Sequence, residues 1–176
     1  MTKSVLVLAL VASGLSVGPQ DAKPPAPRPD DVKSMDAVVA AAYDSISGAA
    51  GQTRDWDRFR SLFVPGARLI PAVAANGGAT ARVLAVEDYI QRSTPGLERG
   101  FFEREIARKV DAFGNIAQVF STYESRHAAA DAAPFARGIN SFQLLKDGDR
   151  WWIVTIYWDS ERPGNPIPEQ YLPRKK

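Results

Sequence analysis

The segment that ends at residue 127 carries the residue types best suited to acid–base chemistry. Glu124 and His127, the one histidine of the chain, follow Tyr123 in a strand-like run. A histidine beside a carboxylate could act as a general base near neutral pH. The alternative is a histidine that ends a strand at a loop and has no chemical role. Asp159, at the end of the last strand-like run, is a third candidate acid or base.

Composition argues against metal, cofactor and nucleic-acid sites. The 176-residue chain has one His and no Cys, whereas zinc and copper sites need several such ligands at close spacing. Its sequence has no Gly-rich phosphate loop and no nucleophile elbow, so we expect neither a metal nor a cofactor. The formal net charge is only +2, and the last three residues are all basic, so no basic face for nucleic acid is expected.

A charged run at 103–108 has two interpretations. In a strand, Glu103 and Glu105 project to one face while Arg104 and Arg108 project to the other, because side chains alternate with a period of two. The first interpretation is a solvated sheet face with cross-strand ion pairs. In the second, Arg104 or Arg108 enters the interior with the apolar residues that share its face, and binds an acidic ligand.

The segment 138–158 predicts a β-hairpin at the centre of the core. Its flanks are rich in Ile, Val, Phe, Trp and Tyr, which suit a buried pleated surface. Asp147-Gly148 tolerates the positive φ of a tight turn. If these two form the loop, Asn140 faces Thr155, and Tyr157 lies on the same surface. That surface is apolar with a few polar tips, as small-molecule sites are, so we expect it to face the helices.

The opposite surface of this hairpin would then carry Trp152 and Trp158. These rings would form a large apolar patch if water covered them. We therefore expect a homodimer that pairs through the outer face of the sheet.

Helical periodicity precedes strand periodicity along the chain. Apolar residues at three- and four-residue spacing predict helices over 35–46, from Thr53 or Asp55 to 64, and over 86–92. Strands are expected at 68–73, 80–85, 101–110, 116–127, 137–145 and 150–158. Short connections make the last four an antiparallel meander. Helices followed by an antiparallel sheet predict one α+β domain with the helices on one sheet face.

Large rings on the helices should meet the concave face of this sheet and line a pocket. The expected pocket residues are Tyr43, Trp56, Tyr123, Asn140, Thr155 and Tyr157, with Arg104 and Arg108 added by the second interpretation of the charged run. The expected ligand is a small apolar or aromatic molecule. The alternative is that these are core residues whose polar groups are satisfied internally.

The two ends of the chain are expected to lie outside the domain. Residues 1–18 have a charged start, an apolar run too short to span a bilayer comfortably, and then small residues, as signal peptides do. The alternatives are a cytosolic helix and a retained membrane anchor. Residues 19–33 read as a Pro-rich linker, 34–165 as the domain and 166–176 as a tail. We expect a secreted or periplasmic protein without a membrane span after leader removal.

Four local strings resemble the nuclear transport factor 2-like (NTF2-like) superfamily, which includes ketosteroid isomerase and SnoaL-like polyketide cyclases. They are FFEREI from 101, FGNIAQVFSTYESR from 113, RGINSFQLL from 137 and DGDRWWIV from 147. The resemblance implies a cystatin-like fold, in which a cone-shaped, curved antiparallel sheet wraps around N-terminal helices. It also implies a mostly apolar pocket and protomers that pair through the sheet. Because one scaffold hosts many functions, it does not imply a reaction.

The isomerase mechanism of that superfamily does not carry over. Its isomerases place a catalytic aspartate in the strand after the second helix, and the matching stretch from Gly66 to Pro71 has no carboxylate. The leading expectation is therefore a secreted small-molecule-binding domain with an apolar, aromatic-lined pocket. One alternative is a SnoaL-like cyclase, isomerase or dehydratase that uses Glu124, His127 or Asp159. The other is a dimerisation module with no active pocket.

Cell fractionation tests the predicted leader. We expect the mature domain outside the cytoplasm, with the leader removed, because residues 1–18 have the charge and hydropathy pattern of an export signal. A chain that stays in the cytosol with these residues intact would show that the localisation is wrong.

Overall fold

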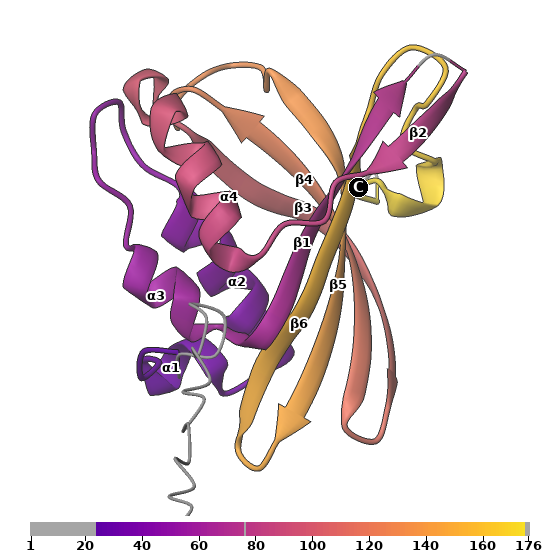
Figure 1. Ribbon diagram of the computed structural model, residues 1–176. Helices are drawn as coiled ribbons and strands as arrows, with labels where there is room; N and C mark the ends of the chain where they lie inside the picture. Colours follow the sequence, from indigo (N-terminus) through magenta and orange to yellow (C-terminus); the bar gives the residue numbers. More distant parts are fainter. Residues whose placement is uncertain (1–23, 76, 175–176) are drawn as a thin grey trace, which may run out of the picture.

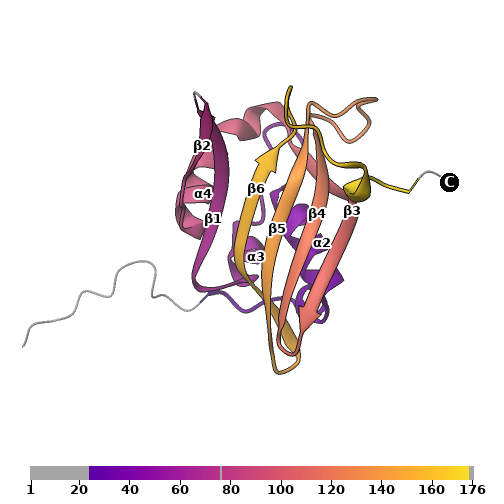
Figure 2. The same cartoon turned by 90° about the vertical axis from the view of Figure 1, so that its right-hand side faces the viewer.

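The computed structural model describes residues 24–75 and 77–174, so the predicted leader and the first part of the predicted linker lie outside it. Within these residues, a curved six-stranded sheet carries the helices on one face (Figures 1 and 2). The prediction of an α+β domain is confirmed. No helix in the described ranges combines the length and the apolar content needed to cross a bilayer.

The three predicted helices form, a further short helix precedes them, and two of the helices have side-chain N-caps. The helices are α1 (Pro29–Val32), α2 (Met35–Ile46), α3 (Trp56–Ser61) and α4 (Val86–Ser93), with 3-10 turns at η2 (Thr94–Arg99) and η3 (Glu169–Tyr171). The Ser34 hydroxyl accepts a hydrogen bond from the Ala37 amide at 3.0 Å at the start of α2. The Asp55 carboxylate does the same for the Arg58 amide in α3, also at 3.0 Å. Both caps satisfy amides that the first helical turn leaves free.

The predicted meander also forms, but the sheet is mixed and not purely antiparallel. Its strands are β1 (Phe63–Ala75), β2 (Gly78–Ala81), β3 (Phe102–Phe113), β4 (Ile116–Arg126), β5 (Ala136–Asp147) and β6 (Arg150–Ser160), in the order β2-β1-β6-β5-β4-β3. β1 pairs with β6 in parallel. The Ile153 amide donates to the Leu62 carbonyl at 2.8 Å, so β1 leaves α3 at the end of the sheet where β6 begins.

The register predicted for the β5–β6 hairpin is wrong. The loop consists of Gly148 (φ 58°) and Asp149, so the turn lies one residue further along than expected. A bulge in the β5–β6 ladder at Gln143 then shifts the pairing again. Asn140 consequently pairs with Trp158 and not with Thr155. The displaced turn shifts the pairing by two residues and leaves the faces of β6 unchanged. The bulge adds a one-residue shift, which exchanges the faces of a strand, so the bulge decides which side chains in the second half of β6 face the helices.

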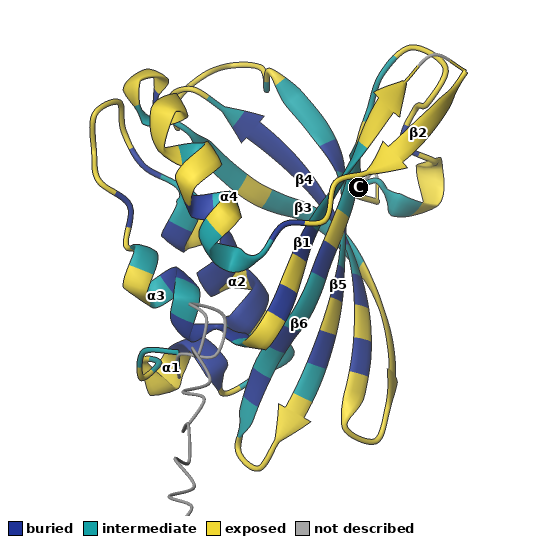
Figure 3. Ribbon diagram, viewed as in Figure 1, coloured by how far each residue is buried: buried dark blue, intermediate teal, exposed yellow. Residues whose placement is uncertain are grey.

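The core lies between α2, α3 and the concave face of the sheet, where buried residues alternate along β5 and along the first half of β4 (Figure 3). The largest fully buried side chains include Phe59, Phe63, Phe142, Leu69 and Ile153. Each large apolar side chain contributes about 1.5–3 kcal/mol by leaving water. Two of them, Phe59 and Phe63, pack edge to face with ring centroids 4.8 Å apart, so α3 and the start of β1 share one aromatic cluster.

The folded unit begins before Ser34, inside the segment predicted to be a linker. Asp31 of α1 is only 8% exposed and accepts two hydrogen bonds from the Arg58 guanidinium, at 2.7 and 2.8 Å. The same guanidinium also reaches Asp44 of α2. Arg58 therefore ties α1 to α2 and α3, and its ion pairs raise its pKa above the ordinary arginine value.

The C-terminal residues predicted to be a tail lie across the outer face of the sheet (Figure 2). Ile167 is buried, and the Tyr171 carbonyl accepts a hydrogen bond from the Thr122 hydroxyl at 2.6 Å. Trp158 faces the helices, and the Arg150 guanidinium lies 3.2 Å from the ring centroid of Trp152. The apolar outer face on which the homodimer prediction rests is thus smaller than expected, and the homodimer stays a prediction.

Replacing Arg58 with Ala should cost about 3 kcal/mol of unfolding free energy, because the largely buried carboxylate of Asp31 loses its cation. The pair formed by Lys33 and Asp30 provides the control, since both side chains are at least 65% exposed. Lys33→Ala should leave the unfolding free energy nearly unchanged, because solvent screens an exposed ion pair. Chemical denaturation of both variants measures this difference, and equal costs would contradict the anchoring role of Arg58.

Candidate functional site

A cavity of about 230 Å³ opens between α2, α4 and the concave face of the sheet. Its walls are mostly apolar, and half of the sixteen lining residues are aromatic. The aromatic residues are Tyr43, Phe59, Tyr89, Phe101, Tyr123, Phe135, Phe142 and Trp158. At on the order of 30 Å³ per molecule, the space equals that of about eight waters, so it suits a small molecule with a single ring.

Glu103 is the one carboxylate in this lining, and it has no cationic partner there. In the described part of the chain, no Lys, Arg or His borders the cavity. Ser125 donates to one carboxylate oxygen at 2.8 Å, and Asn140 lies 3.4 Å from the other. Burial nevertheless raises the pKa of Glu103 to about 7, because the two hydrogen bonds only partly replace lost hydration.

A chain of hydrogen bonds leads away from this carboxylate through the core. The Asn140 amide donates to the Tyr43 hydroxyl at 3.1 Å, and that hydroxyl lies 2.7 Å from the Ser121 hydroxyl. Ser121 in turn donates to Glu105. Since Ser121 donates its one hydrogen to Glu105, it must accept from the Tyr43 hydroxyl, and every member of the chain has a defined direction. The network holds Asn140 and Tyr43 in fixed positions at the cavity wall.

The tyrosines around the cavity remain neutral over the physiological range. Burial, together with the nearby charge of Glu103, raises the pKa of Tyr43 and Tyr89 well above the ordinary value. The pKa of Tyr123 rises to about 12, chiefly through burial. Tyr123 pairs with Gly138 on β5, where an added Cβ would lie 2.5 Å from the tyrosine oxygen. Gly138 thus provides the space that the Tyr123 ring occupies.

A β-bulge at Ile106 decides which charged residues of β3 face inward. Before the bulge, Glu103 and Glu105 pair with the inward-facing Ser125 and Tyr123 of β4. Arg104 lies outside, where its side chain is 69% exposed and forms an ion pair with Glu124. The two arginines do not share a face as a strict period of two predicts, since Arg108 lies beyond the bulge and is paired with Glu105 at 2.6 Å.

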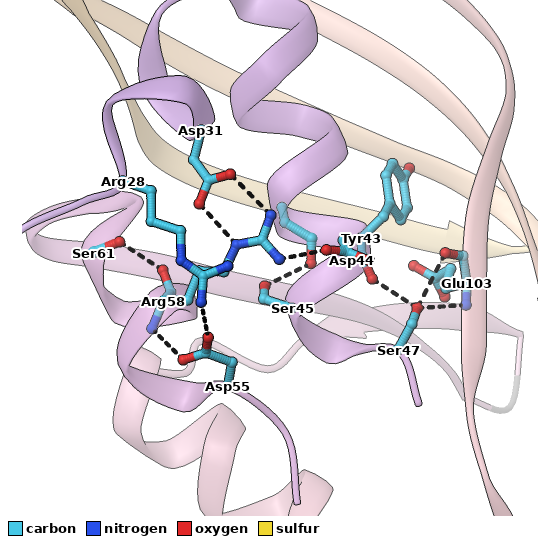
Figure 4. A network of polar contacts seen from close by, with 11 residues as sticks. Arg28, Asp31, Tyr43, Asp44, Ser45, Ser47, Asp55, Arg58, Ser61 and Glu103 are labelled. Atoms are coloured by element: carbon cyan, nitrogen blue, oxygen red, sulfur yellow. Dashed lines mark hydrogen bonds and ion pairs between the residues drawn. The ribbon is translucent and has the colours of Figure 1, made fainter. Parts of the chain in front are cut away.

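Two residues between α2 and α3 fix the position of Glu103 along β3. The Ser47 hydroxyl accepts a hydrogen bond from the Glu103 amide at 3.0 Å and donates to the Tyr43 carbonyl at 2.7 Å (Figure 4). The Arg54 guanidinium, only 4% exposed, donates to the carbonyls of Ile46 and Gly48 at 2.9 and 2.8 Å. Arg54 therefore holds the loop that carries Ser47, and both are positioning residues.

The structure brings together three of the residues predicted to line the pocket, namely Tyr43, Tyr123 and Asn140. Trp56 lies in an adjoining pocket of about 240 Å³ that shares Ile46, Tyr89 and Phe101 with the cavity. Thr155 and Tyr157 lie on the opposite sheet face as a result of the corrected register, and Tyr157 is 47% exposed.

The charged residues predicted from the sequence lie outside the cavity. Arg104 and Arg108 line an outer groove between α2 and β3, of about 490 Å³, which reaches the other side of Glu103. Glu124 lies on the outer face, where two arginines hold its carboxylate. The hydrogen bonds from Arg126 and Arg104 outweigh burial and lower its pKa below the ordinary value.

The other two predicted acid–base candidates are also held in structural contacts. His127 stacks on Phe135, with ring centroids 4.2 Å apart, and its Nδ1 lies 3.2 Å from the Gly100 carbonyl. Phe135 is part of the cavity wall, so His127 lies behind that wall and not in it. Asp159 is paired with Arg162 at 2.6 Å. Among the described residues, no group of three or more His, Cys, Asp or Glu side chains is arranged to hold a metal.

Glu103 is a candidate functional residue that the sequence did not predict. The alternation of Glu103 with Arg104 predicts a strand whose charged side chains are solvated, because charged residues on both faces of a strand are ordinarily exposed. The apolar residue Phe101, two positions earlier on the same face, also lines the cavity and indicates that this face turns inward.

Comparisons with known proteins agree with this geometry at the level of the fold. No protein-family model and no curated protein matches the chain. A Nostoc punctiforme protein of unknown function with a cystatin-like fold matches at TM-score 0.53 and 13% identity, over 70% of this chain and 86% of that one. A proposed dehydratase of the NTF2-like family from Streptomyces avermitilis matches at TM-score 0.53 and 10% identity, over 75% of this chain and 96% of that one.

A third structure, a proposed calcium/calmodulin-dependent protein kinase type II association domain from Thiobacillus denitrificans, matches at TM-score 0.53 and 11% identity. This match covers 80% of this chain and 100% of that one. The chain therefore has the NTF2-like fold, as its local strings indicate. At such identities the likeness concerns the fold alone, and the activity must be argued from the site.

Replacing Glu103 with Gln should stabilise the protein above neutral pH. The folded carboxyl has a pKa of about 7 against an ordinary value of 4.5, so the folded state holds a proton that the unfolded chain releases. Stability is therefore lost as pH rises from 4.5 to about 7, by about 3 kcal/mol in total. The Gln variant escapes this loss and should gain up to that amount at about pH 8, but little at about pH 4.5.

Denaturant unfolding across this pH range is the measurement, with Glu124→Gln as the matched control. The Glu124 pKa is lowered, so removal of that charge should destabilise the protein at about pH 8. A Glu103→Gln variant that is less stable than the wild type at every pH would contradict the claim that the Glu103 carboxylate lacks a compensating cation.

Proposed function

We propose that the protein binds a small, mainly apolar molecule in the cavity between α2, α4 and the sheet. The observation that carries this proposal is the combination of aromatic walls with a single unpaired carboxylate, Glu103. Small-molecule sites have this character, with an apolar lining and a few polar groups that fix orientation. An interior that served only stability would have little reason to keep a carboxylate there, since its burial opposes folding at neutral pH.

The polar groups of the cavity are arranged to orient a ligand. Asn140 donates both of its amide hydrogens, one to Glu103 and one to Tyr43. Its carbonyl oxygen accepts no hydrogen bond from the described residues and is available to a donor group. Glu103 is partly exposed because it borders both the cavity and the outer groove. The groove provides a route by which a ligand could reach the carboxylate.

Proton transfer by Glu103 is a second candidate function. A carboxyl group with a pKa of about 7 in an apolar cavity is suited to take a proton from a substrate at neutral pH. Glu103 would then replace Glu124, His127 and Asp159 as the acid or base of an NTF2-like enzyme. This function uses the same residue as the binding function and differs from it in requiring turnover.

The location and the oligomeric state of the domain are also proposed. We propose that the domain acts outside the cytoplasm, on the strength of the leader-like sequence of residues 1–18. Pairing of two copies through the outer sheet face is also proposed. Exposed Tyr157 would lie at such an interface.

Indole, a small ring with one N–H donor, is a suitable probe for the cavity. We expect saturable binding to the wild type and at least ~tenfold weaker binding to Ala136→Phe, because Ala136 lines the cavity and a phenyl ring there fills it. Ala132→Phe is the matched control, since Ala132 is exposed in the preceding loop and should leave binding unchanged. Calorimetric titration measures the three affinities, and equal affinity in both variants would refute binding in this cavity.

A further inference from the structure

We propose that the ligand of this cavity is a small apolar amine, which binds as an ammonium ion with its charge on Glu103. This inference rests on the proposed binding function and names the chemical class of its ligand. It follows from three features of the site, which are the unbalanced charge, the excess of hydrogen-bond acceptors and the aromatic walls.

The charge of Glu103 has no counterpart within the described protein. The nearest arginines along β3 are engaged elsewhere, because Arg104 pairs with Glu124 and Arg108 pairs with Glu105 and Asp36. An ionised carboxylate in an apolar site is unfavourable unless a cation accompanies it. A cationic ligand supplies that partner, whereas an anionic ligand would add a second negative charge.

The hydrogen-bonding groups of the cavity call for a donor. Ser125 and Asn140 each donate one hydrogen bond to Glu103, which leaves lone pairs on both carboxylate oxygens. The Asn140 carbonyl oxygen is a further acceptor, since its amide hydrogens are already used. An ammonium group has three donors and no acceptor, so it matches this set better than a hydroxyl or a carbonyl group does.

The walls favour a cation attached to an apolar body. Tyr43, Tyr89, Tyr123 and Trp158 line the same cavity as Glu103. Aromatic faces attract ammonium groups, most strongly where water is excluded. The rest of the lining is apolar and would receive the hydrocarbon part of the ligand, so a primary amine on a single ring has the required character.

The groups that face Glu103 make its protonation the expected control on binding. They are Tyr43 from α2, Tyr89 from α4 and Tyr123 from β4 on the cavity side, and Glu105 along β3. On the side of the outer groove, they are Asp44, Arg104, Arg108 and Arg126, each of which is held in an ion pair with another residue. The tyrosines have raised pKa values and stay neutral, and Arg108 holds Glu105 in an ion pair. Affinity for an ammonium ion should therefore fall as pH drops below about 7, where Glu103 takes up a proton.

Calorimetric titration with phenethylamine and phenethyl alcohol tests the ligand class on the full-length protein. These probes share a ring and differ in the charge of the terminal group. At about pH 8 we expect the amine to bind at least ~tenfold more tightly than the alcohol, as a charge-assisted hydrogen bond exceeds a neutral one. Below about pH 7 the preference should decline by ~tenfold per pH unit.

Two variants assign this preference to one carboxylate. Glu103→Gln should bind both probes with similar affinity and without the pH dependence, and the alcohol confirms that its cavity is intact. Glu124→Gln removes a carboxylate from the opposite face of the neighbouring strand and should retain the wild-type preference. This comparison also separates Glu103 from His127, which lies behind Phe135 and is unchanged in both variants.

The outcomes distinguish this inference from the function on which it rests. Equal affinity of the wild type for both probes would overturn the amine class and leave a general apolar site in place. A preference that persists in Glu103→Gln would also overturn the amine proposal. Binding of neither probe to the wild type would refute both proposals.

Discussion

The bulge in β3 is the constraint on which the rest of the site depends. A regular strand keeps one alternation throughout, so its two glutamates would share a face with every second residue that follows. The bulge at Ile106 separates the two halves of the strand, and the first half can then place Glu103 against Ser125 while Arg104 pairs outside with Glu124. As a result, the Glu103 carboxylate lies in an apolar cavity, while the neighbouring Arg104 lies on the other side of the sheet.

The surrounding structure compensates only part of the cost of that placement. Ser47 and Arg54 fix the backbone at Glu103 from the segment between α2 and α3, and Ser125 and Asn140 supply two hydrogen bonds to its carboxylate. The remaining penalty is expressed as the raised pKa of Glu103. Ionisable groups with perturbed pKa values are found most often where ligands bind or protons are transferred. A ligand that carries a positive charge would remove this penalty.

Much of the fold could be predicted from the sequence because its cues are local. The cap at Ser34, the periodicity of α2 and the strand runs on either side of Gly148 each depend on a few neighbouring residues. The parallel pairing of β1 with β6 could not be predicted in this way, since it depends on the path of the chain between α3 and β3. The fold of α1 depends likewise on a distant partner, Arg58.

The site was predictable only in part, for the same physical reason. Tyr43, Tyr123 and Asn140 border the cavity because helix and strand periodicity alone directs them inward. The positions of Thr155 and Tyr157 depend on the register of β6, in which one bulge exchanges the two faces of the strand. The inward position of Glu103 could not be predicted, because an ionised residue next to an arginine is ordinarily assigned to the surface.

The carboxyl carbon of Glu103 offers the most direct test of this account. Carbon-13 NMR of the ligand-free protein can follow this nucleus through a pH titration, with Glu103→Gln used to assign its signal. We expect a midpoint of about 7, since the folded protein provides apolar surroundings and no cation for this carboxylate. A midpoint at or below the ordinary value of 4.5 would mean that Glu103 is well solvated or paired, and would contradict the central claim.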